Sequence, residues 1–387
     1  MNRIVVVGRG LIGSAAARHL AECTDGVVCI GPDEPQNRVS HDGVFASHYD
    51  EGRMTRHVDP MQEWAITAGQ SIKRYRDIEE RSGIAFYSPS GYLGLGFPGD
   101  TYNARCAETG ESIGASLDRL DAETVRTRYP YLCVPDTIDG LVETGGAGHI
   151  SPRRMVEAQT TLAAQAGATI VRQAARSIRA APSGVEVELW DGSIVSAAKA
   201  LIATGVFTSP LKLSPVDLGL TVYGRTTVLV RVEGEAVNML RDMPTMIDTS
   251  VGAYILPPIQ YPDGRSYLKM GIGTEDDPKF TSMSELQNWF KSKGSEADRI
   301  HFTQHLKTLI PVLETCSFWR TDSCAVTFTK SRLPIIDSVL DDRIFVAVGG
   351  CGKGAKGADE WGRIAAGMVR QLPWSFDVKG EKLALPN

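Results

Sequence analysis

The start of the chain places a glycine-rich turn directly between a strand and a helix. The apolar residues 3–7 predict a buried parallel strand, and the sequence Gly-Arg-Gly-Leu-Ile-Gly follows at residues 8–13. A helix rich in alanine is predicted over residues 14–22, and a second strand over residues 26–30. Together these elements form a βαβ unit of the size expected for a nucleotide-binding fold.

Each glycine of this turn has a role in such a unit. Gly8 permits the sharp turn, Gly10 lets the backbone approach a pyrophosphate, and Gly13 lets the helix pack closely on the strand. Leu11 and Ile12 begin the helix, whose N-terminus supplies hydrogen-bond donors and the positive end of a dipole. We therefore expect a dinucleotide site. The alternative is an ordinary strand, turn and helix without a ligand, because the glycine pattern by itself is weak.

The acidic residue that usually accepts the ribose hydroxyls is displaced in this chain. The second strand ends in Ile-Gly-Pro-Asp-Glu, so Asp33 or Glu34 is expected to reach the ribose from a shifted position. The alternative is that both are solvated turn residues between two prolines.

A second glycine-rich turn lies near the end of the chain. Residues 343–348 predict a strand, Gly-Gly-Cys-Gly-Lys-Gly follows at residues 349–354, and residues 361–369 predict a helix. A further strand at residues 200–203 is followed by Thr-Gly, and Gly205 is therefore also expected to contact the cofactor. Two such turns suit a long cofactor whose phosphates and ring both meet backbone, so FAD is favoured over NAD.

The remaining pattern predicts an α/β protein with two lobes. A Rossmann-type FAD-binding domain is expected from residues 1–85, 145–215 and 325–387, with an inserted α+β substrate domain from residues 86–144 and 216–324. Strands predicted at residues 220–232 and 266–272 give the inserted domain a mostly antiparallel sheet. A helical stretch is predicted over residues 285–309.

Composition excludes several classes of protein. The 387 residues are 42% hydrophobic and 22% charged, which suits a globular fold, and the net charge of -5 with no long basic run argues against a nucleic-acid partner. The apolar N-terminal run is too short for a signal peptide and no stretch is long enough to span a membrane, so a cytoplasmic protein is expected. Seven cysteines without a C-x-x-C pair argue against disulfides and a zinc site, and no metal is expected. The seven histidines form no convincing catalytic group.

A more specific resemblance lies in the segment Ser-His-Tyr-Asp-Glu-Gly-Arg-Met-Thr-Arg-His at residues 47–57. It resembles the loop after the second strand in the sarcosine oxidase and N-methyltryptophan oxidase branch of the D-amino-acid-oxidase-like flavoproteins. The resemblance implies that Arg53 lies beside the flavin and that Arg56 binds the substrate carboxylate, for which a guanidinium offers a planar fork. It also places Ser47 and His48 at the cofactor and Tyr49 among the catalytic residues.

Two further segments resemble the same family. Residues 267–271 resemble a strand whose lysine promotes electron transfer to oxygen, which implies that role for Lys269. Residues 349–356 resemble the last flavin-contacting loop, which places Gly352 and Gly354 at the cofactor. Lys356 then helps to bind the substrate carboxylate, and Tyr254 is expected in the substrate pocket.

Cys324 is the expected point of covalent attachment. In the family a cysteine that precedes an Ile-Ile-Asp segment forms a thioether with the flavin, and here that aspartate follows Cys324 by thirteen residues. The resemblance therefore implies a cysteinyl FAD. The alternative is an ordinary buried cysteine, with Cys316 as a nearby competitor.

The chain also departs from the family pattern around the substrate. Tyr49 and Gly273 each replace a histidine, and Val326 replaces an aromatic residue. Additional cations at Lys330, Arg332 and Lys353 suggest a substrate with a second carboxylate, such as iminodiacetate.

The resemblance implies an oxidase of a small secondary amino acid that forms an imine and hydrogen peroxide, with the amine and oxygen as partners of a monomer or homodimer. One alternative is a dehydrogenase that passes electrons to a quinone or carrier protein. Another is a flavin-binding protein without catalysis, which would leave Arg53, Arg56 and Lys356 unexplained.

Overall fold

A parallel core forms the centre of the first sheet in the computed structural model, which describes residues 2–386. β1 pairs with β2 and β12, β9 extends the sheet beyond β2, and β20 continues it beyond β12. Antiparallel strands β10, β11 and β19 complete its edges. The strands are β1 (Asn2–Val7), β2 (Val27–Ile30), β9 (Thr169–Val171), β10 (Ala175–Ala181), β11 (Gly184–Leu189), β12 (Ile194–Ile202), β19 (Ile335–Leu340) and β20 (Ile344–Val348).

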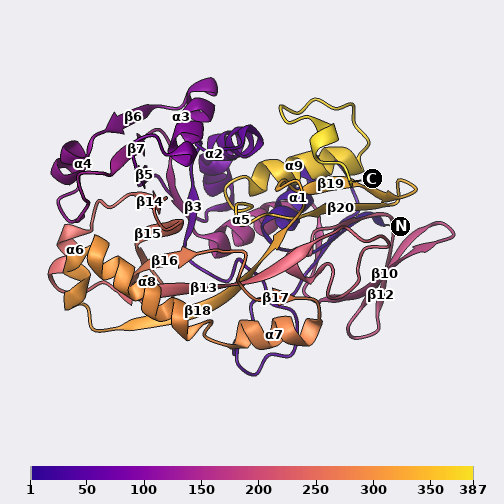
Figure 1. Cartoon of the computed structure of the whole chain (residues 1–387). Helices are drawn as coiled ribbons and strands as arrows, with labels where there is room; N and C mark the ends of the chain where they lie inside the picture. Colours follow the sequence, from indigo (N-terminus) through magenta and orange to yellow (C-terminus); the bar gives the residue numbers. More distant parts are fainter. Residues whose placement is uncertain (1, 387) are drawn as a thin grey trace.

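A layer of helices covers one face of this sheet (Figure 1). α1 (Leu11–Ala21) packs between α5 (Pro152–Gln165) and α9 (Ala358–Val369), and α2 (Gln62–Ser82) lies against α5 and α9. The strands direct alternate residues to the two faces, as a period of two requires. Val6 of β1 therefore packs in the core beneath α1 and α9, whereas its neighbours in the strand pack on the opposite face.

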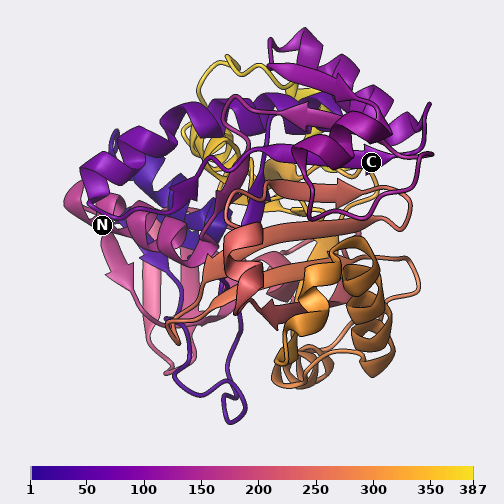
Figure 2. The ribbon, with the colours of Figure 1, turned by 90° about the vertical axis from the view of Figure 1, so that its left-hand side faces the viewer.

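The second sheet is mostly antiparallel and follows the order β17-β13-β16-β15-β14-β5-β7-β6, with β18 on the free side of β13. Helix α8 packs on β13 and β16, on one face of this sheet (Figure 2). The strands are β5 (Tyr92–Gly96), β6 (Leu117–Leu120), β7 (Asp139–Glu143), β13 (Thr221–Arg231), β14 (Thr245–Asp248), β15 (Ala253–Gln260), β16 (Ser266–Ile272), β17 (Lys279–Phe280) and β18 (Trp319–Phe328).

A small third sheet and several short helices complete the chain. The sheet contains β3, β8 and β4 in that order. Its strands are β3 (Arg53–Thr55), β4 (Tyr87–Ser88) and β8 (Gly148–Ile150). The remaining helices are α3 (Thr101–Ser112), α4 (Ala122–Arg128), α6 (Glu235–Met239), α7 (Met283–Lys291) and α8 (Glu296–Leu309), with 3-10 turns η1 (Gly205–Phe207), η2 (Pro311–Thr315) and η3 (Gly380–Lys382).

The helical stretch predicted over residues 285–309 is wrong in one respect, because it is two helices. α7 ends at Lys291, and Gly294 has a φ of +80°, a left-handed conformation that interrupts the helix. Ser295 then begins α8, and its side chain accepts a hydrogen bond from the amide of Asp298. A helix stop and a new cap thus lie within one predicted element.

The fold is of the α/β class, as the sequence predicts. The first sheet draws its strands from the segments assigned to the FAD-binding domain, and the second from those assigned to the substrate domain, except that β18 crosses residue 325. The exact domain boundaries stay a prediction. Between residues 2 and 386, no helix combines the length and apolar sequence needed to cross a bilayer.

One buried carboxylate connects the four helices of the first domain. Asp359, at the start of α9, is fully buried and accepts hydrogen bonds from Arg18 of α1 at 2.7 Å and from Arg74 of α2 at 2.5 Å. Gln159 of α5 donates to it at 2.9 Å. Burial would raise the pKa of Asp359, but His19 and the two arginines hold it well below its ordinary value. The helices that follow the two glycine-rich turns, α1 and α9, are therefore joined by a buried ion pair between Arg18 and Asp359.

We expect Asp359→Asn to lower the free energy of unfolding by about 3 to 5 kcal/mol, because it removes the buried carboxylate shared by the buried Arg18 and the half-buried Arg74. Denaturant unfolding measures this change. Asp377→Asn is the matched control, since Asp377 is exposed and bonds only Gln70, and it should change stability by less than about 0.5 kcal/mol. Equal stability of the two variants would contradict the role given to Asp359.

Candidate functional site

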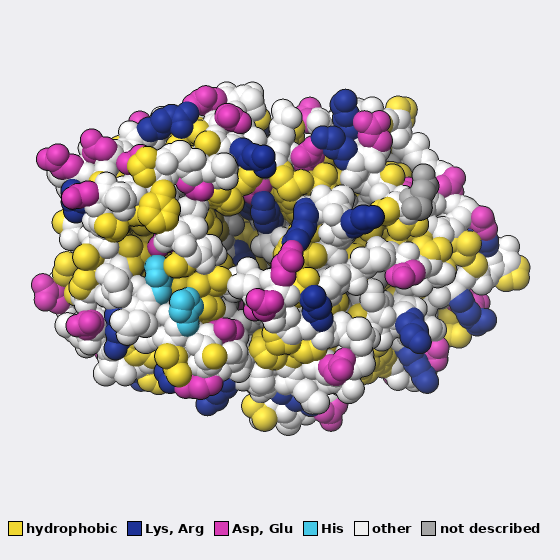
Figure 3. Space-filling model, viewed as in Figure 1, with side chains coloured by type: hydrophobic (Ala, Val, Ile, Leu, Met, Phe, Trp, Pro, Cys, Tyr) yellow, Lys and Arg dark blue, Asp and Glu magenta, His cyan; other side chains and the backbone are white. Residues whose placement is uncertain are grey.

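A cavity of about 550 Å³ lies where the two glycine-rich turns meet the second sheet. In the space-filling view, the molecule is hollowed near its centre and Lys and Arg side chains gather there (Figure 3). Most of the predicted site residues line this cavity. They are Gly8, Gly10, Leu11, Ile12, Ser47, His48, Tyr49, Arg53, Arg56, Gly205, Tyr254, Cys324, Gly352, Gly354 and Lys356.

The first glycine-rich turn is packed tightly on its protein side and open on its cavity side. A Cβ on Gly8 would lie 2.3 Å from the carbonyl oxygen of Ala203, and one on Gly13 would lie 1.8 Å from that of Gly8. Gly13 thus acts by packing and does not line the cavity. A Cβ on Gly10 would meet only His48, at 3.9 Å. The first intrahelical bond runs from Ser14 to Gly10, so the amides before Ser14 have no partner within α1.

This geometry fits the phosphates of a dinucleotide. A bare backbone at Gly10 and a helix N-terminus with open amides provide donors and a favourable dipole for an anion. The opposite turn has the same property, since Gly352 has a φ of +71° and a Cβ there would meet only Phe328, at 3.8 Å. The cavity thus has an exposed glycine backbone contributed by both turns.

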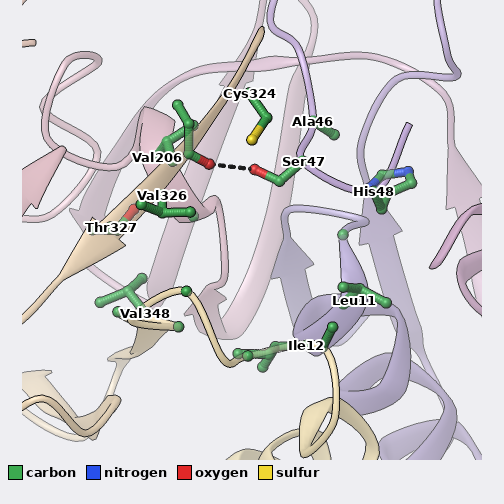
Figure 4. A pocket seen from close by; sticks show the side chains of 18 of the residues that line it. Leu11, Ile12, Ala46, Ser47, His48, Val206, Cys324, Val326, Thr327 and Val348 are labelled. Atoms are coloured by element: carbon green, nitrogen blue, oxygen red, sulfur yellow. Dashed lines mark hydrogen bonds between the residues drawn. The ribbon is translucent and has the colours of Figure 1, made fainter. Parts of the chain in front are cut away.

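Cys324 lies on the cavity wall (Figure 4). Its sulfur points toward the space between β18 and the segment that carries Ser47 and His48, and Ser47 donates a 2.8 Å hydrogen bond to the carbonyl of Ala325 beside it. Cys316 is buried in the core beneath α8 and does not line the cavity. Of the two cysteines considered from the sequence, only Cys324 is therefore placed to meet a ligand there.

Arg56 is a buried cation on the cavity wall, and no carboxylate from residues 2–386 is bound to it. It is 4% exposed, its guanidinium lies 4.4 Å from the centre of the Tyr92 ring, and its Nη2 donates to the Tyr102 hydroxyl at 2.6 Å. Its Nη1 is buried and has no hydrogen-bond partner in the described chain. Because a buried charged donor without a partner is costly, this nitrogen indicates a binding position for an anion.

Two lysines beside Arg56 share one carboxylate. Asp59 is fully buried and accepts from Lys353 and from Lys356, each at 2.8 Å. Burial would raise the pKa of Asp59, but the lysines and Arg56 hold it below its ordinary value. Burial lowers the pKa of Lys356 to about 8, although Asp59 opposes the shift. Three cations therefore face a single carboxylate, and this end of the cavity has an excess of positive charge.

Lys269 is placed differently from the other predicted residues. It is 1% exposed, and its Nζ donates at 2.5 Å to both a carboxylate oxygen of Asp50 and the carbonyl of Gly52. Asp50 also pairs with Arg53 and accepts a 2.8 Å bond from the Tyr261 hydroxyl. Burial and the charge of Arg53 hold the pKa of Lys269 well below its ordinary value. Lys269 is therefore behind the cavity wall, with its charge directed at Asp50.

The ribose end of the site also differs from the expectation. Asp33 lies outside the main cavity, in an adjoining pocket, where its carboxylate pairs with Arg9 and with Arg172. The hydroxyl of Tyr49 donates to the carbonyl of Asp33 at 3.2 Å. Burial, with nearby arginines, lowers the pKa of His48 to about 3, so this imidazole is neutral at physiological pH.

Several residues of the site are not evident from the sequence. Asp50 lies in the segment that carries the two predicted arginines and Asp59 follows it by two residues, but only the fold shows which lysines they bind. Arg225 of β13 also lines the cavity, and the one sequence signal for it is the absent side chain at Gly273. Lys330 and Arg332, which suggested a second carboxylate, are exposed and do not line the cavity. Lys353 does line it, paired with Asp59.

Known proteins resemble this chain over nearly its full length. The family described as FAD dependent oxidoreductase matches residues 3–368. An N-methyl-L-tryptophan oxidase of Escherichia coli K12 is 25% identical over 404 residues, which cover 98% of each chain. Among solved structures, glycine oxidase from Geobacillus kaustophilus has a TM-score of 0.75 at 20% identity and covers 100% of this chain and 99% of its own. Iminodiacetate oxidase from Chelativorans sp. BNC1 has a TM-score of 0.75 at 18% identity and covers 99% of each.

We expect the affinity for a small carboxylate such as acetate to fall above pH 8. An amine whose pKa is lowered to about 8 carries its charge below that pH and loses it above, so Lys356 stops contributing while Arg56 remains charged. The dissociation constant, measured by calorimetry between pH 6.5 and 9.5, should rise about tenfold. Lys356→Arg is the matched control, because its side chain stays charged and the rise should disappear. A wild-type affinity that does not change with pH would contradict this assignment.

Proposed function

The chain belongs to the family of FAD-dependent oxidoreductases, and from this premise we propose that it oxidises the C–N bond of a small secondary amino acid. In this reaction the amine loses two hydrogens to become an imine, and oxygen gains them to become hydrogen peroxide. The observation that carries the proposal is Arg56, a buried guanidinium on the cavity wall. Within the described residues it is bound to no carboxylate, and one of its nitrogens has no partner. It provides a position for the carboxylate of an amino acid.

The residues of the two turns fit FAD. The open amides after Gly10 would hold the diphosphate, while Gly205, Gly352 and Gly354 would meet the cofactor with bare backbone. Bound FAD supplies the acceptor for the electrons and hydrogen of the broken C–H bond. The protein contributes the position of the substrate and the charges around it.

Charge on the cavity wall supports the binding of an amino acid with a neutral amine. Arg56 and Lys356 bind and orient the carboxylate, which fixes the α-carbon relative to the rest of the site. Arg53 and Lys353 add further positive charge to the same cavity. Nearby cations disfavour a second positive charge, so they lower the pKa of the bound amine and leave its lone pair free for imine formation.

The relatives are consistent with this substrate class. They include an oxidase of N-methyl-L-tryptophan and an oxidase of iminodiacetate, both of which are secondary amines, beside an oxidase of glycine, a primary amine. We further propose that Cys324 binds the flavin through a thioether, because its sulfur faces the cavity while Cys316 is buried elsewhere.

A second candidate function is a dehydrogenase that passes the electrons to a quinone or carrier protein. The ion pair of Lys269 with Asp50 favours it, since an ammonium that stabilises forming superoxide must direct its charge at the oxygen. Here that charge is compensated by a carboxylate 2.5 Å away. The oxidase stays the first proposal, because the relatives named above are oxidases of amino acids.

We expect the purified protein to consume oxygen with secondary amino acids and to release an equal amount of hydrogen peroxide. The panel contains sarcosine, proline, pipecolate and iminodiacetate, each beside a primary-amine counterpart. An oxygen electrode with and without catalase gives the peroxide yield. Substrate oxidation that proceeds only with an added quinone or dye would favour the dehydrogenase, and no oxidation with either acceptor would contradict both proposals.

Acid precipitation tests the thioether. We expect the flavin colour to remain with the precipitated wild-type protein and to pass into the supernatant for Cys324→Ser, because serine cannot form the sulfur bond. Cys316→Ser is the control and should retain the colour in the pellet. Flavin found wholly in the supernatant of the wild type would rule out the covalent bond.

A further inference from the structure

The cavity wall carries a second arginine whose binding edge is open. Arg225 of β13 uses only its Nη1 for hydrogen bonds, to Asp277 and to the carbonyls of Gly224 and Thr274. Its Nε and Nη2 make no hydrogen bond to any residue between 2 and 386. These two nitrogens form one of the edges with which a guanidinium binds a carboxylate by two parallel hydrogen bonds.

The position of this guanidinium depends on a missing side chain. A Cβ on Gly273 would lie 2.6 Å from Nε of Arg225 and 3.1 Å from its Cζ. Tyr223 and Phe328 hold the group from the sides, with ring centres 5.0 and 5.7 Å from Cζ. Arg225 therefore fills space on the cavity wall that a larger residue 273 would occupy.

Arg225 and Arg56 lie beside different strands of the second sheet, Arg225 on β13 and Arg56 against Tyr92 of β5. From one arginine to the other the strands follow the order β13-β16-β15-β14-β5, which Figure 1 shows along the left half of the molecule, with β5 uppermost. Arg56 stacks on Tyr92 of β5, and Arg225 extends from β13. Four strand spacings of about 4.8 Å separate these backbones by roughly 19 Å, and both side chains reach into the cavity between them.

The wall between the two arginines suits an extended ligand. Tyr254 of β15 and Ile247 of β14 pair directly across the sheet, and both line the cavity. Ile247 offers apolar surface, and the Tyr254 hydroxyl makes no hydrogen bond within the described chain. The cationic side chains of the lining are Arg9, Arg53, Arg56, Arg225, Lys353 and Lys356, and no Asp or Glu side chain from residues 2–386 lines the cavity.

We propose that Arg225 binds a second acidic group of the substrate, so that the enzyme acts on N-substituted amino acids with two carboxylates separated by a spacer. This inference rests on the proposed oxidation of an amino acid held by Arg56. The first carboxylate binds Arg56 and Lys356, the spacer lies along Ile247 and Tyr254, and the second carboxylate binds the free edge of Arg225. Asp277 holds Nη1 and thereby directs that edge into the cavity.

The test compares ligands of equal length with one or two carboxylates: butyrate with succinate, pentanoate with glutarate and hexanoate with adipate. Their dissociation constants are measured from the change in flavin absorption of the holoenzyme, without turnover. At the best chain length, the wild type should bind the dicarboxylate at least about tenfold more tightly than its partner. Arg225→Gln should abolish this preference and leave the affinities for monocarboxylates within twofold.

Two further variants make the result specific. Arg332→Gln removes an exposed arginine that pairs with Glu275 outside the cavity, and it should keep the wild-type preference. Gly273→Ala retains every charge but places a Cβ against the guanidinium, and it should reduce the preference as Arg225→Gln does. FAD content and thermal unfolding show whether Arg225→Gln has lost its fold. If it has, the dicarboxylate preference of Gly273→Ala decides whether Arg225 binds the second carboxylate.

The proposal is overturned if the wild type shows no preference for dicarboxylates, or if the folded Arg225 and Gly273 variants retain it. It is also overturned if Arg225→Gln weakens both classes of ligand equally, because Arg225 would then support the cavity or the cofactor in general. Failure of the proposed oxidation is distinguishable from these results. Selective dicarboxylate binding without any amine turnover would leave the role of Arg225 standing and remove the oxidase, whereas turnover of neutral secondary amines without a dicarboxylate preference would do the reverse.

Discussion

The position of the two glycine-rich turns depends on the buried carboxylate of Asp359. Each turn is followed by a helix, and the arginine of α1 and the aspartate of α9 meet at 2.7 Å with no water-exposed surface on the carboxylate. Because breaking a buried ion pair leaves an uncompensated charge, this contact resists any separation of the helices. The amides that open each turn toward the cavity therefore stay at a fixed relative position, although more than 330 residues separate the two turns in the sequence. A long cofactor that needs backbone contacts at both places depends on this constraint.

The cavity itself follows a second rule of charge pairing. Most cations of the cavity wall form an ion pair with a carboxylate that does not line the cavity. Asp50 pairs with Arg53, Asp59 pairs with both lysines, and Asp277 pairs with Arg225. Such pairing reduces the cost of burying several like charges together and fixes the direction of each side chain. Arg56 is the exception, since aromatic rings and a phenol hydroxyl are its neighbours. The site is thus organised to bind an anion, and within the described residues Arg56 is the cavity-wall cation that lacks a carboxylate partner.

Local sequence was sufficient to predict the parts of the fold that depend on neighbouring residues. The βαβ unit around Gly8 and Gly13, the strands at residues 220–232 and 266–272 and the final strand and helix at residues 343–369 follow from short apolar patterns and turn residues. The break at Gly294 was missed, although residues 291–296 are Lys-Ser-Lys-Gly-Ser-Glu and interrupt the apolar pattern. The cavity-lining residues came largely from the resemblance at residues 47–57 and 349–356. What the sequence could not supply were contacts between distant segments, such as the pairing of Lys269 with Asp50, because charge partners 219 residues apart leave no periodic signal.

The departures from the family pattern are not independent once the contacts are known. Lys353 is an additional cation relative to the family pattern, yet it binds the same carboxylate as Lys356, so its charge compensates Asp59. Gly273 departs from a histidine, and the space this opens is occupied by Arg225. Tyr49 departs from another histidine, and its hydroxyl is bonded to the backbone of Asp33, away from the substrate wall. Two of these three changes alter the balance or the position of cations around the substrate, whereas the third adjusts the ribose end. Since two of the three changes act on cations of the cavity wall, their combined effect is on which anion the cavity accepts, while the backbone that would hold the cofactor keeps its form.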